Sequence, residues 1–461
     1  MAVEAAFVVP HPPLIVPEIG KGQERAVQKT IDAYRQVARR IGEVKPDTIV
    51  VISSHQVMYA NYFHISPGEE ARGTFERFQA GQVGFEVTYD TEFVEVLCGL
   101  AAEAGLPAGT EGETDCQLDH GTMVPLYFIG KCWTDCRLVR IGMSGLSLMR
   151  HYELGQCIGE AARLLGRKTV VVASGDLSHR LKSEGPYGFQ KEGPEYDSRM
   201  MYALGNGNFG ELLEFPEGLC NKAGECGHRA IVMMAGTLDR TGVTARRLSY
   251  EGPFGIGYGI CEYLVRGEDP KRDFKEQHEQ KERVKVSAQI EKQDAYVALA
   301  RRAVEEYVRT GQIIGIPSGL PRELYNQKAG VFVSIKENGS LRGCIGTIQP
   351  GEESLAGEII RNAVSAAVRD PRFSPVEPEE LDRLSITVDV LGQVEKIRSP
   401  NELDVKRYGV IVESGSSRGL LLPNLEGVET VQEQISIARR KAGIDEREEV
   451  ELERFEVVRH F

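Results

Sequence analysis

The sequence TIVVISSH, from Thr48 to His55, combines a hydrophobic strand pattern with a histidine at its carboxyl end. Residues 48–52 are all β-branched and follow a Pro-Asp turn, which is typical of a strand buried within a parallel sheet. Similar runs occupy residues 5–9 and 169–173, and segments with helical spacing of apolar residues lie between the runs. This alternation of strands and helices predicts an α/β domain.

Each of the three strand-like runs is followed within a few residues by a histidine. These are His11 after the first run, His55 after the second and His179 after the third. Because open α/β sheets bind ligands at the carboxyl ends of their strands, we expect the three side chains at one edge of the sheet. A single loop histidine most often bonds a backbone carbonyl, but imidazole is also the commonest transition-metal ligand. Several histidines at one edge therefore predict a mononuclear metal site, with His11 and His55 as two of its ligands.

A change in composition after residue 266 predicts a domain boundary. Residues 267–289 carry a Gly-Glu-Asp-Pro turn and a charge-dense stretch with almost nothing to bury, so they form a linker or a solvated helix. Residues 290–461 mix helix and strand patterns without regular βαβ alternation. We expect an α/β domain over residues 1–266 and an α+β domain over 290–461. In the second domain the pattern predicts a helix at 294–309 and strands at 330–336, 341–348 and 384–391.

Composition excludes several classes of protein. Of the 461 residues 41% are hydrophobic, and the net charge of −13 disfavours binding to nucleic acid or to anionic membranes. No apolar run approaches the roughly 18 residues that span a bilayer, and the first residues lack the basic start of a secretory signal. The nine cysteines are odd in number and scattered, which argues against a disulfide framework. We expect a cytoplasmic protein with reduced thiols.

The order of motifs in residues 1–266 resembles that of the class III extradiol dioxygenases, the LigB-like proteins, and of the related Memo family. The resemblance covers the whole first domain and implies the same α/β fold. The motifs that carry it are Pro10–Pro13 (PHPP), Ser53–His55 (SSH), Asp119–Gly121 (DHG), Ser174–His179 (SGDLSH) and Glu225–His228 (ECGH), the last running into Met233–Gly236 (MMAG).

The resemblance also implies roles for individual residues. In the dioxygenases the first two histidines bind Fe(II) with a later acidic residue, and another histidine is the acid/base group. Transferred to this chain, His11 and His55 are metal ligands, His179 is the acid/base group and His120 lies near the substrate. Asp176, in the small-residue turn before His179, is expected to orient the imidazole. An imidazole with a pKa near ambient pH suits a reaction in which a catechol loses and regains protons.

The third ligand is where this chain departs from the dioxygenase pattern. Relatives place a carboxylate or a histidine just before the final helix, whereas this chain has Glu225, Cys226 and His228 there. Memo-type sequences have Cys-Gly at this point, so we expect Cys226 to be the ligand. The alternatives are Glu225 or His228 as the ligand, an inert buried thiol at Cys226, and a hydrogen-bonding role for His228 outside the coordination sphere. A thiolate ligand favours Zn or Cu without excluding Fe(II), which is the metal we expect.

The glycine-rich run at residues 252–259, GPFGIGYG, superficially suggests a phosphate-binding loop. Such a loop would need a lysine at fixed spacing and a helix directly after it, and neither signal is present. We therefore interpret the run as a tightly packed glycine-rich strand or bulge.

Residues 290–461 resemble the AMMECR family, a domain of poorly defined function. The resemblance is carried by Leu341–Thr347 (LRGCIGT), with support from Asp370–Phe373 (DPRF) and Gly419–Pro423 (GLLLP). Cys344 beside Arg342 forms a possible thiol site, because a nearby cation favours the thiolate. The alternative is a structural cysteine at a strand turn, which the lack of a His–Asp partner set favours.

These expectations combine into a metal-dependent oxidoreductase, a dioxygenase-like enzyme that acts on an aromatic or catechol-like small molecule. The second domain would cover the site, bind substrate or recruit a partner, and the resemblance implies a radical-SAM protein as that partner. In such a setting the host could be anaerobic, and O2 need not be the co-substrate. Two rival functions stay open: a non-catalytic module that binds a metal or a phenol, and a Zn-dependent hydrolase.

Overall fold

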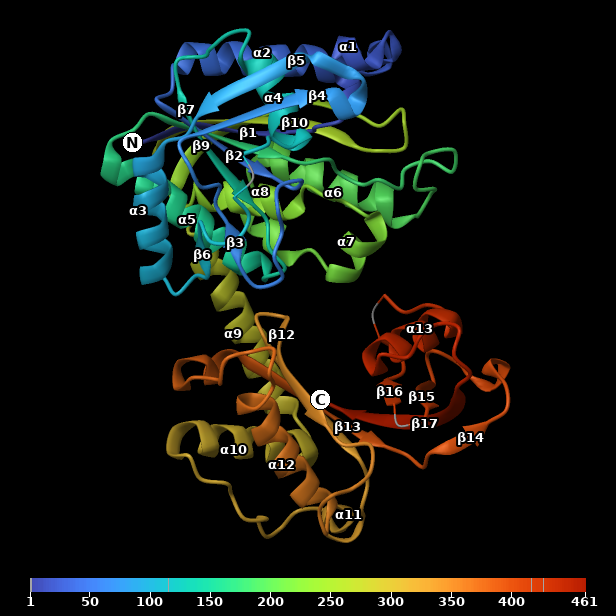
Figure 1. Ribbon diagram of the computed structural model, residues 1–461. Helices are drawn as coiled ribbons and strands as arrows, with labels where there is room; N and C mark the ends of the chain where they lie inside the picture. Colours follow the sequence, from blue (N-terminus) through green and yellow to red (C-terminus); the bar gives the residue numbers. More distant parts are fainter. Residues whose placement is uncertain (1, 115, 416, 426) are drawn as a thin grey trace. The chain divides into compact units, whose positions relative to one another are not determined.

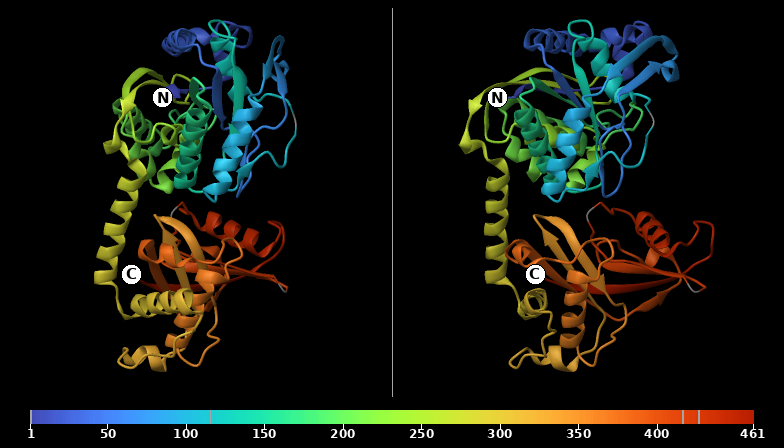
Figure 2. Two further views of the ribbon diagram at one scale, coloured as in Figure 1. Left: turned by 90° about the vertical axis from the view of Figure 1, so that its left-hand side faces the viewer. Right: turned by 60° about the vertical axis from the view of Figure 1, so that its left-hand side comes forward.

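The chain folds into two compact units, Met1–His278 (unit 1) and Glu279–Phe461 (unit 2). The computed structural model describes residues 2–114, 116–415, 417–425 and 427–461. The two units divide within α9 (Phe274–Lys292), which Figure 2 shows as one continuous helix. The stretch predicted to be a linker or a solvated helix thus contains a helix, and its role as a spacer between independently folding domains stays a prediction.

Unit 1 is built on a six-stranded sheet. Its strands are β1 (Val3–Val9), β2 (Thr48–Ser53), β7 (Arg137–Gly142), β8 (Thr169–Ser174), β9 (Thr241–Glu251) and β10 (Tyr258–Glu268). The order is β7-β2-β8-β1-β10-β9, and the first four strands are parallel. The antiparallel pair β10 and β9 then extends the sheet beside β1. This arrangement confirms the α/β prediction.

Helices cover both faces of this sheet because its central strands are apolar on both sides. In β2, Ile49 and Val51 belong to one hydrophobic core, and Val50 and Ile52 belong to the other. Figure 1 shows the two layers of helices on opposite sides of the sheet. The first core includes residues of α2 (Gln28–Val44) and α4 (His120–Ile129), and the second includes residues of α3 (Thr91–Glu103), α5 (Leu148–Leu165), α6 (Glu192–Asn206), α7 (Glu217–Ala223) and α8 (His228–Gly236).

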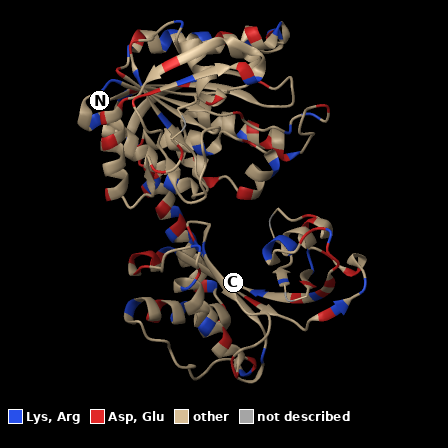
Figure 3. Ribbon diagram, viewed as in Figure 1, with Lys and Arg blue, Asp and Glu red and all other residues tan. Residues whose placement is uncertain are grey.

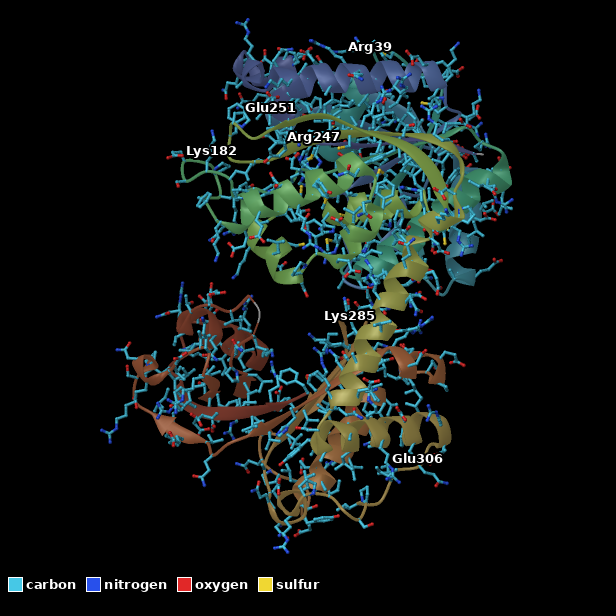
Figure 4. The ribbon with its side chains drawn as sticks, turned by 180° about the vertical axis from the view of Figure 1, so that it is seen from behind. Arg39, Lys182, Arg247, Glu251, Lys285 and Glu306 are labelled. Atoms are coloured by element: carbon cyan, nitrogen blue, oxygen red, sulfur yellow. The ribbon has the colours of Figure 1, made fainter. Side chains whose placement is uncertain are left out.

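Smaller elements complete unit 1. Two short sheets are formed by β3 (Phe63–His64) with β6 (Ala108–Gly109) and by β4 (Glu70–Phe75) with β5 (Ala80–Thr88). A short helix, α1 (Pro17–Gly20), follows β1. Glu251, the last residue of β9, is labelled in Figure 4. Its carboxylate accepts hydrogen bonds from the N–H and the hydroxyl of Thr30 in α2, each at 2.8 Å, and so connects the antiparallel edge of the sheet to this helix.

The glycine-rich run at residues 252–259 differs from its prediction. It begins as a loop, and strand β10 starts only at Tyr258. Gly257 exchanges backbone hydrogen bonds with the segment after β8: its N–H donates to the Ser178 carbonyl at 2.8 Å, and its carbonyl accepts from Leu177 N–H at 2.9 Å. A Cβ on Gly257 would lie 2.1 Å from the Asp197 carboxylate. The glycine is therefore required by a close approach to Asp197 of helix α6, which periodicity along one segment does not predict.

Unit 2 is α+β, as predicted. Its strands are β11 (Val331–Glu337), β12 (Ser340–Gly346), β13 (Leu384–Leu391), β14 (Glu395–Ile397), β15 (Tyr408–Ser414), β16 (Ser417–Leu421) and β17 (Glu451–His460). The antiparallel order is β12-β11-β13-β17-β15-β16, and β14 also pairs with β17. The helices are α10 (Ala295–Thr310), α11 (Arg322–Asn326), α12 (Leu355–Val368) and α13 (Val431–Ala442). Helix α10 confirms the prediction for 294–309, with Asp294 as its N-cap.

Two features agree with the expectations from composition. All nine cysteines are free, so no disulfide framework exists. Within the described ranges, no helix has both the length and the apolar character that crossing a bilayer requires. The longest helix, α9, instead carries acidic and basic side chains along its length (Figure 3).

Candidate metal centre

Parallel pairing brings the two predicted histidine ligands to one point. Val9 of β1 and Ser53 of β2 both pair in register with Ser174 of β8, so the three strands end at the same level. His11 and His55 each lie two residues beyond their strand. Their Nε2 atoms are 3.0 Å apart, and the rings meet edge to face with centroids 4.6 Å apart. The structure therefore brings these two side chains together, as the sequence predicts.

A serine at the end of β8 fixes how the His11 ring presents its nitrogens. The Ser174 hydroxyl donates to the Gly121 carbonyl at 2.5 Å, so its oxygen is left to accept a hydrogen bond. His11 Nδ1 lies 3.1 Å from that oxygen and donates its proton there. The other nitrogen, Nε2, consequently keeps its lone pair and faces His55. A second partner that holds the imidazole in this way is typical of metal-binding histidines.

Cys226 supplies a third donor atom at the same point. Its Sγ lies 3.6 Å from His11 Nε2, and the donor atoms of His11, His55 and Cys226 all lie within 4.8 Å of one another. Around a tetrahedral ion with ordinary bond lengths, two nitrogens lie roughly 3.4 Å apart and a nitrogen and a sulfur roughly 3.6 Å apart. The separations of 3.0 and 3.6 Å fit one shared ion.

Two glycines hold the loop of Cys226 against the end of β8. A Cβ on Gly175 would lie 2.2 Å from the Cα of Gly227, and a Cβ on Gly227 would lie 2.9 Å from the Asp176 carbonyl. That carbonyl accepts the N–H of Gly227 at 3.0 Å, while Asp176 N–H points to the Cys226 sulfur at 3.2 Å. The backbones can approach this closely only without side chains at both positions.

We predict that Gly175→Ala destabilises unit 1 and weakens its metal binding. The added methyl group meets backbone atoms, which cannot rotate away, so we expect a loss of about 1–3 kcal/mol in the free energy of unfolding. Urea unfolding and metal titration of the same samples measure both effects. Gly99→Ala is the matched control, because Gly99 lies in α3 with no atom within 4 Å of its added Cβ. A Gly175→Ala protein as stable as the Gly99→Ala protein would contradict this account.

Glu225 and His228, the two alternative third ligands, lie outside this donor set. Together with Cys220 they form a separate cluster. His228 Nε2 donates to the Leu212 carbonyl at 2.8 Å, which leaves Nδ1 to accept from the Cys220 thiol at 3.4 Å. Glu225 accepts the N–H of His228 at 2.6 Å. Of the three candidates, only Cys226 is grouped with His11 and His55.

The ring of His120 contacts the rings of both His55 and His11. It is the first residue of α4, whose N-cap Asp119 accepts the N–H of Thr122 at 3.0 Å. The His120 ring centroid is 3.9 Å from that of His55 and 5.4 Å from that of His11. Asp119 also accepts the hydroxyl of Ser53 at 2.5 Å, so the start of α4 is bonded to the end of β2.

His179 and Asp176 come to the same region, but not with the predicted contact. Asp176 is buried, and its carboxylate accepts the backbone N–H of His11 at 2.9 Å instead of bonding the His179 imidazole. Its charge nevertheless acts on His179. The Nε2 atom of His179 is buried and has no hydrogen-bond partner among the described residues, and Tyr187 packs on the ring at 5.1 Å. Asp176 therefore positions the His11 loop.

Burial controls the ionisation of these groups. Desolvation, followed by the charge of His55, lowers the pKa of His11 to about 3, and desolvation also lowers the pKa of His120 to about 3. Desolvation also lowers the pKa of His55. This residue is exposed, but its ring packs on the rings of His11 and His120, which remove water from it. The same cause raises the pKa of Asp176 to about 6 and that of the Cys226 thiol well above its usual range. At neutral pH the imidazoles are thus unprotonated and ready to bind a metal ion.

Sequence reasoning missed the two serines that support the site. Ser53 and Ser174 occupy the last position of β2 and β8 and pair with each other in register. One bonds Asp119 and the other holds His11. The signal was present, because two strand patterns that each end in a serine before a histidine point to supporting hydrogen bonds.

In unit 2 the predicted pairing of Cys344 with Arg342 is corrected. A bulge at Arg342 shifts the register of β12 against β11, so that Leu341 pairs with Lys336 and Cys344 with Ser334. The Arg342 guanidinium forms two hydrogen bonds with Glu380, at 2.7 and 3.0 Å. The cations whose charge acts on Cys344 are Arg372, Lys441 and Arg459.

Comparison with known proteins agrees with this architecture. Residues 5–261 match the family model described as the catalytic LigB subunit of aromatic ring-opening dioxygenase. The chain belongs to the LigB family. Residues 297–460 match the AMMECR1 model, so a LigB domain is fused to an AMMECR domain. Enzymes of the LigB family depend on a metal, and the group formed by His11, His55 and Cys226 in the LigB domain suits one.

Individual relatives cover the whole chain or one part of it. A protein of Clostridium acetobutylicum is 38% identical over 474 residues, covering 100% of this chain and 99% of its own length. A Thermotoga maritima protein is 52% identical over 167 residues, 36% of this chain and 96% of that protein. A solved structure of an uncharacterised Pyrococcus horikoshii protein is 38% identical and covers 36% of this chain and 88% of its own, with a TM-score of 0.33.

Proposed function

We propose that the LigB domain is a mononuclear metal-dependent enzyme that acts on a catechol-like aromatic molecule. The observation that carries the proposal is the convergence of His11, His55 and Cys226 from three separate segments, with donor atoms within 4.8 Å of one another. Both imidazoles are unprotonated at neutral pH and one is held by Ser174. Three protein ligands leave coordination positions for a substrate, as in catalytic metal sites.

Fe(II) is the metal we propose first, with Zn and Cu as alternatives, because a set of two imidazoles and one thiolate accepts all three. When bound, the ion supplies Lewis acidity and, if it is redox-active, electron transfer. Cys226 must lose its proton to become a ligand. Because burial raises the pKa of this thiol, metal binding is expected to release a proton and to strengthen with rising pH.

His179 is the proposed acid/base group for the substrate hydroxyls. Its Nε2 is buried and has no hydrogen-bond partner within the described part of the chain, so the atom is available to accept a proton. Burial lowers the pKa of His179 while the charge of Asp176 raises it, and the neutral imidazole that results can act as a base. Returning this proton to the ring-opened or oxidised product would complete the proton balance.

The surroundings suit an aromatic ligand that enters from solvent. His55 is exposed, so one side of the donor group is open. Tyr187 packs on His179 at 5.1 Å and Phe78 meets His120 at 5.5 Å, which places aromatic rings beside two of the site histidines. Ring contacts of this kind favour a planar aromatic substrate. A radical-SAM partner remains a prediction from the resemblance.

The test loads anaerobically purified protein with Fe(II), Zn or no metal and then supplies O2 and 3,4-dihydroxyphenylacetate. Oxygen uptake that depends on Fe(II) and matches the amount of ring-opened product would support the enzyme. Phenylacetate, which lacks both hydroxyls, is the control and should not react. Tight binding of the catechol without product would support the non-catalytic module instead. Hydrolysis of an ester, the phenol ester of acetic acid, by the Zn form alone would support the hydrolase.

A further inference from the structure

Unit 2 contains a cavity of about 690 Å³ that the LigB-type chemistry does not involve. The alternation of β11 places it: Val331, Val333 and Ile335 belong to the core with α12, whereas Phe332, Ser334 and Lys336 line the cavity. The volume lies within the range of small-molecule sites. We call this space the unit 2 cavity.

Three small polar side chains lie in a row across its floor. Ser334 of β11 pairs in register with Cys344 of β12 and with Thr387 of β13, and all three line the cavity. The Ser334 hydroxyl donates to the Cys344 sulfur at 3.3 Å. The thiol of Cys344 is thus held at a fixed place beside the cavity.

The charge of the lining is opposite to that of the whole chain. Although the chain carries a net charge of −13, the lining includes five basic residues and no acidic one. The positive charges of two of the five are neutralised by acids outside the lining. Arg372 forms an ion pair with Asp370 at 2.6 Å, and Arg459 forms one with Asp389 at 2.7 Å. The remaining basic residues are Arg301, Lys336 and Lys441.

These remaining cations form no ion pair among the described residues of unit 2, although the charge of Glu305 in α10 acts on Arg301. Arg301 is 6% exposed, and its guanidinium donates to neutral acceptors, Gln293 Oε1 and the Leu384 carbonyl, each at 3.1 Å. Lys336 and Lys441 are exposed at the cavity and form no ion pair there. A buried cation without an acid is costly, so an anion that enters the cavity would be favoured.

We propose that the unit 2 cavity binds a small organic anion next to the thiol of Cys344. Arg301, Lys336 and Lys441, which form no ion pair among the described residues, supply positive charge for a carboxylate or phosphate group. Phe332 and Leu420 are among the apolar residues of the lining, and they suit an apolar body on the same molecule. This proposal is independent of the metal centre in unit 1.

The first test compares two reagents of similar size at Cys344. With either iodoacetate or iodoacetamide, the thiolate sulfur attacks the CH2 carbon of the reagent, so an S–C bond forms as the C–I bond breaks and iodide leaves. Only iodoacetate is an anion. Peptide mass spectrometry of the full chain gives the ratio of the two rates at each cysteine. We expect the ratio at Cys344 to exceed that at the exposed Cys132 by about tenfold, and to fall as NaCl is added. Equal ratios at the two cysteines would overturn the proposal.

Variants then identify the source of the effect. Lys336→Gln and Lys441→Gln should each lower the iodoacetate preference at Cys344. Lys396→Gln should leave the preference unchanged. Lys396 of β14 forms an ion pair with Glu451 of β17 and is not part of the cavity lining. A preference that persists in the Lys336→Gln, Lys441→Gln double variant would refute the assignment of the anion to this cavity. The comparison in the unmodified chain does not depend on how the variants fold.

The second test uses ligands to protect Cys344 from iodoacetamide at constant ionic strength. Benzoate or phenyl phosphate should slow the reaction at Cys344 and not at Cys132, and whichever protects at the lower concentration identifies the preferred anionic group. Benzyl alcohol, which has the ring without the charge, should not protect. Equal protection by benzyl alcohol, or none by either anion, would reject an organic-anion site.

Discussion

Metal binding is expected to fall from about one ion per chain to none when any of His11, His55 or Cys226 is replaced with alanine. The donor atoms of these residues form one group within 4.8 Å, so each removal leaves too few ligands to retain the ion. Element analysis and cobalt titration measure the loss, and a thiolate-to-cobalt absorption band should be absent from the Cys226→Ala protein. Ser174→Ala, which removes only the support of His11, should weaken affinity by about 10–100-fold.

Matched controls separate this group from its neighbours. Cys220→Ala removes a cysteine from the second cluster and should leave the metal bound. His120→Ala removes a ring that contacts His55 but is not among the three donors, and it too should retain the metal. If the Cys220→Ala protein lost its metal while the Cys226→Ala protein kept it, the ion would belong to the second cluster.

Turnover is expected to fall by ~10²–10⁴-fold in the His179→Ala protein while the metal stays bound. The reason is that His179 is proposed to move a proton and not to hold the ion. Burial lowers its pKa, so the imidazole is neutral at neutral pH and becomes protonated as the pH falls through that pKa. Activity of the unmodified protein should therefore decline on the acid side, and this acid limb should disappear from the residual activity of His179→Ala.

The control for His179 is another histidine of unit 1 that lies outside the site. His278 pairs with Glu214 at 3.0 Å, and His278→Gln should keep both the metal and the pH profile. Loss of metal from His179→Ala as complete as that from His55→Ala would place His179 among the ligands. In that event the position assigned to Cys226 would already be filled, and that assignment would be wrong.

Local pattern was enough to predict the strands and the meeting of two histidines. Residues 48–52 and 169–172 are all β-branched, and both runs are rich in apolar side chains at successive positions, which is typical of strands buried on both faces. Parallel strands end at a common edge, so His11 and His55, each two residues beyond β1 or β2, are expected near that edge. Strands β1 and β2 flank β8, so the two histidines meet across its end, and packing sets the 3.0 Å between their Nε2 atoms.

The choice among Glu225, Cys226 and His228 could not be made from spacing alone. Within a four-residue loop, the direction of each side chain depends on backbone angles that distant contacts impose. Here the contact is between Gly227 and Gly175, more than 50 residues apart in sequence, together with the start of α8 at His228. The same reason explains why Asp176 bonds the His11 backbone and not the imidazole that follows it.

The sequence by itself determined the family, the two-domain order, the strand ends and the pair His11 and His55, because periodicity and motif order are local properties. Only the tertiary structure decided which side chain completes the donor group and which cations surround Cys344. Arg342 is its neighbour in the chain, yet a single bulged residue turns it toward Glu380, while Lys441 acts on the thiol from α13. Charges act through space, and distances between segments far apart in the chain are set by packing rather than by spacing in the sequence.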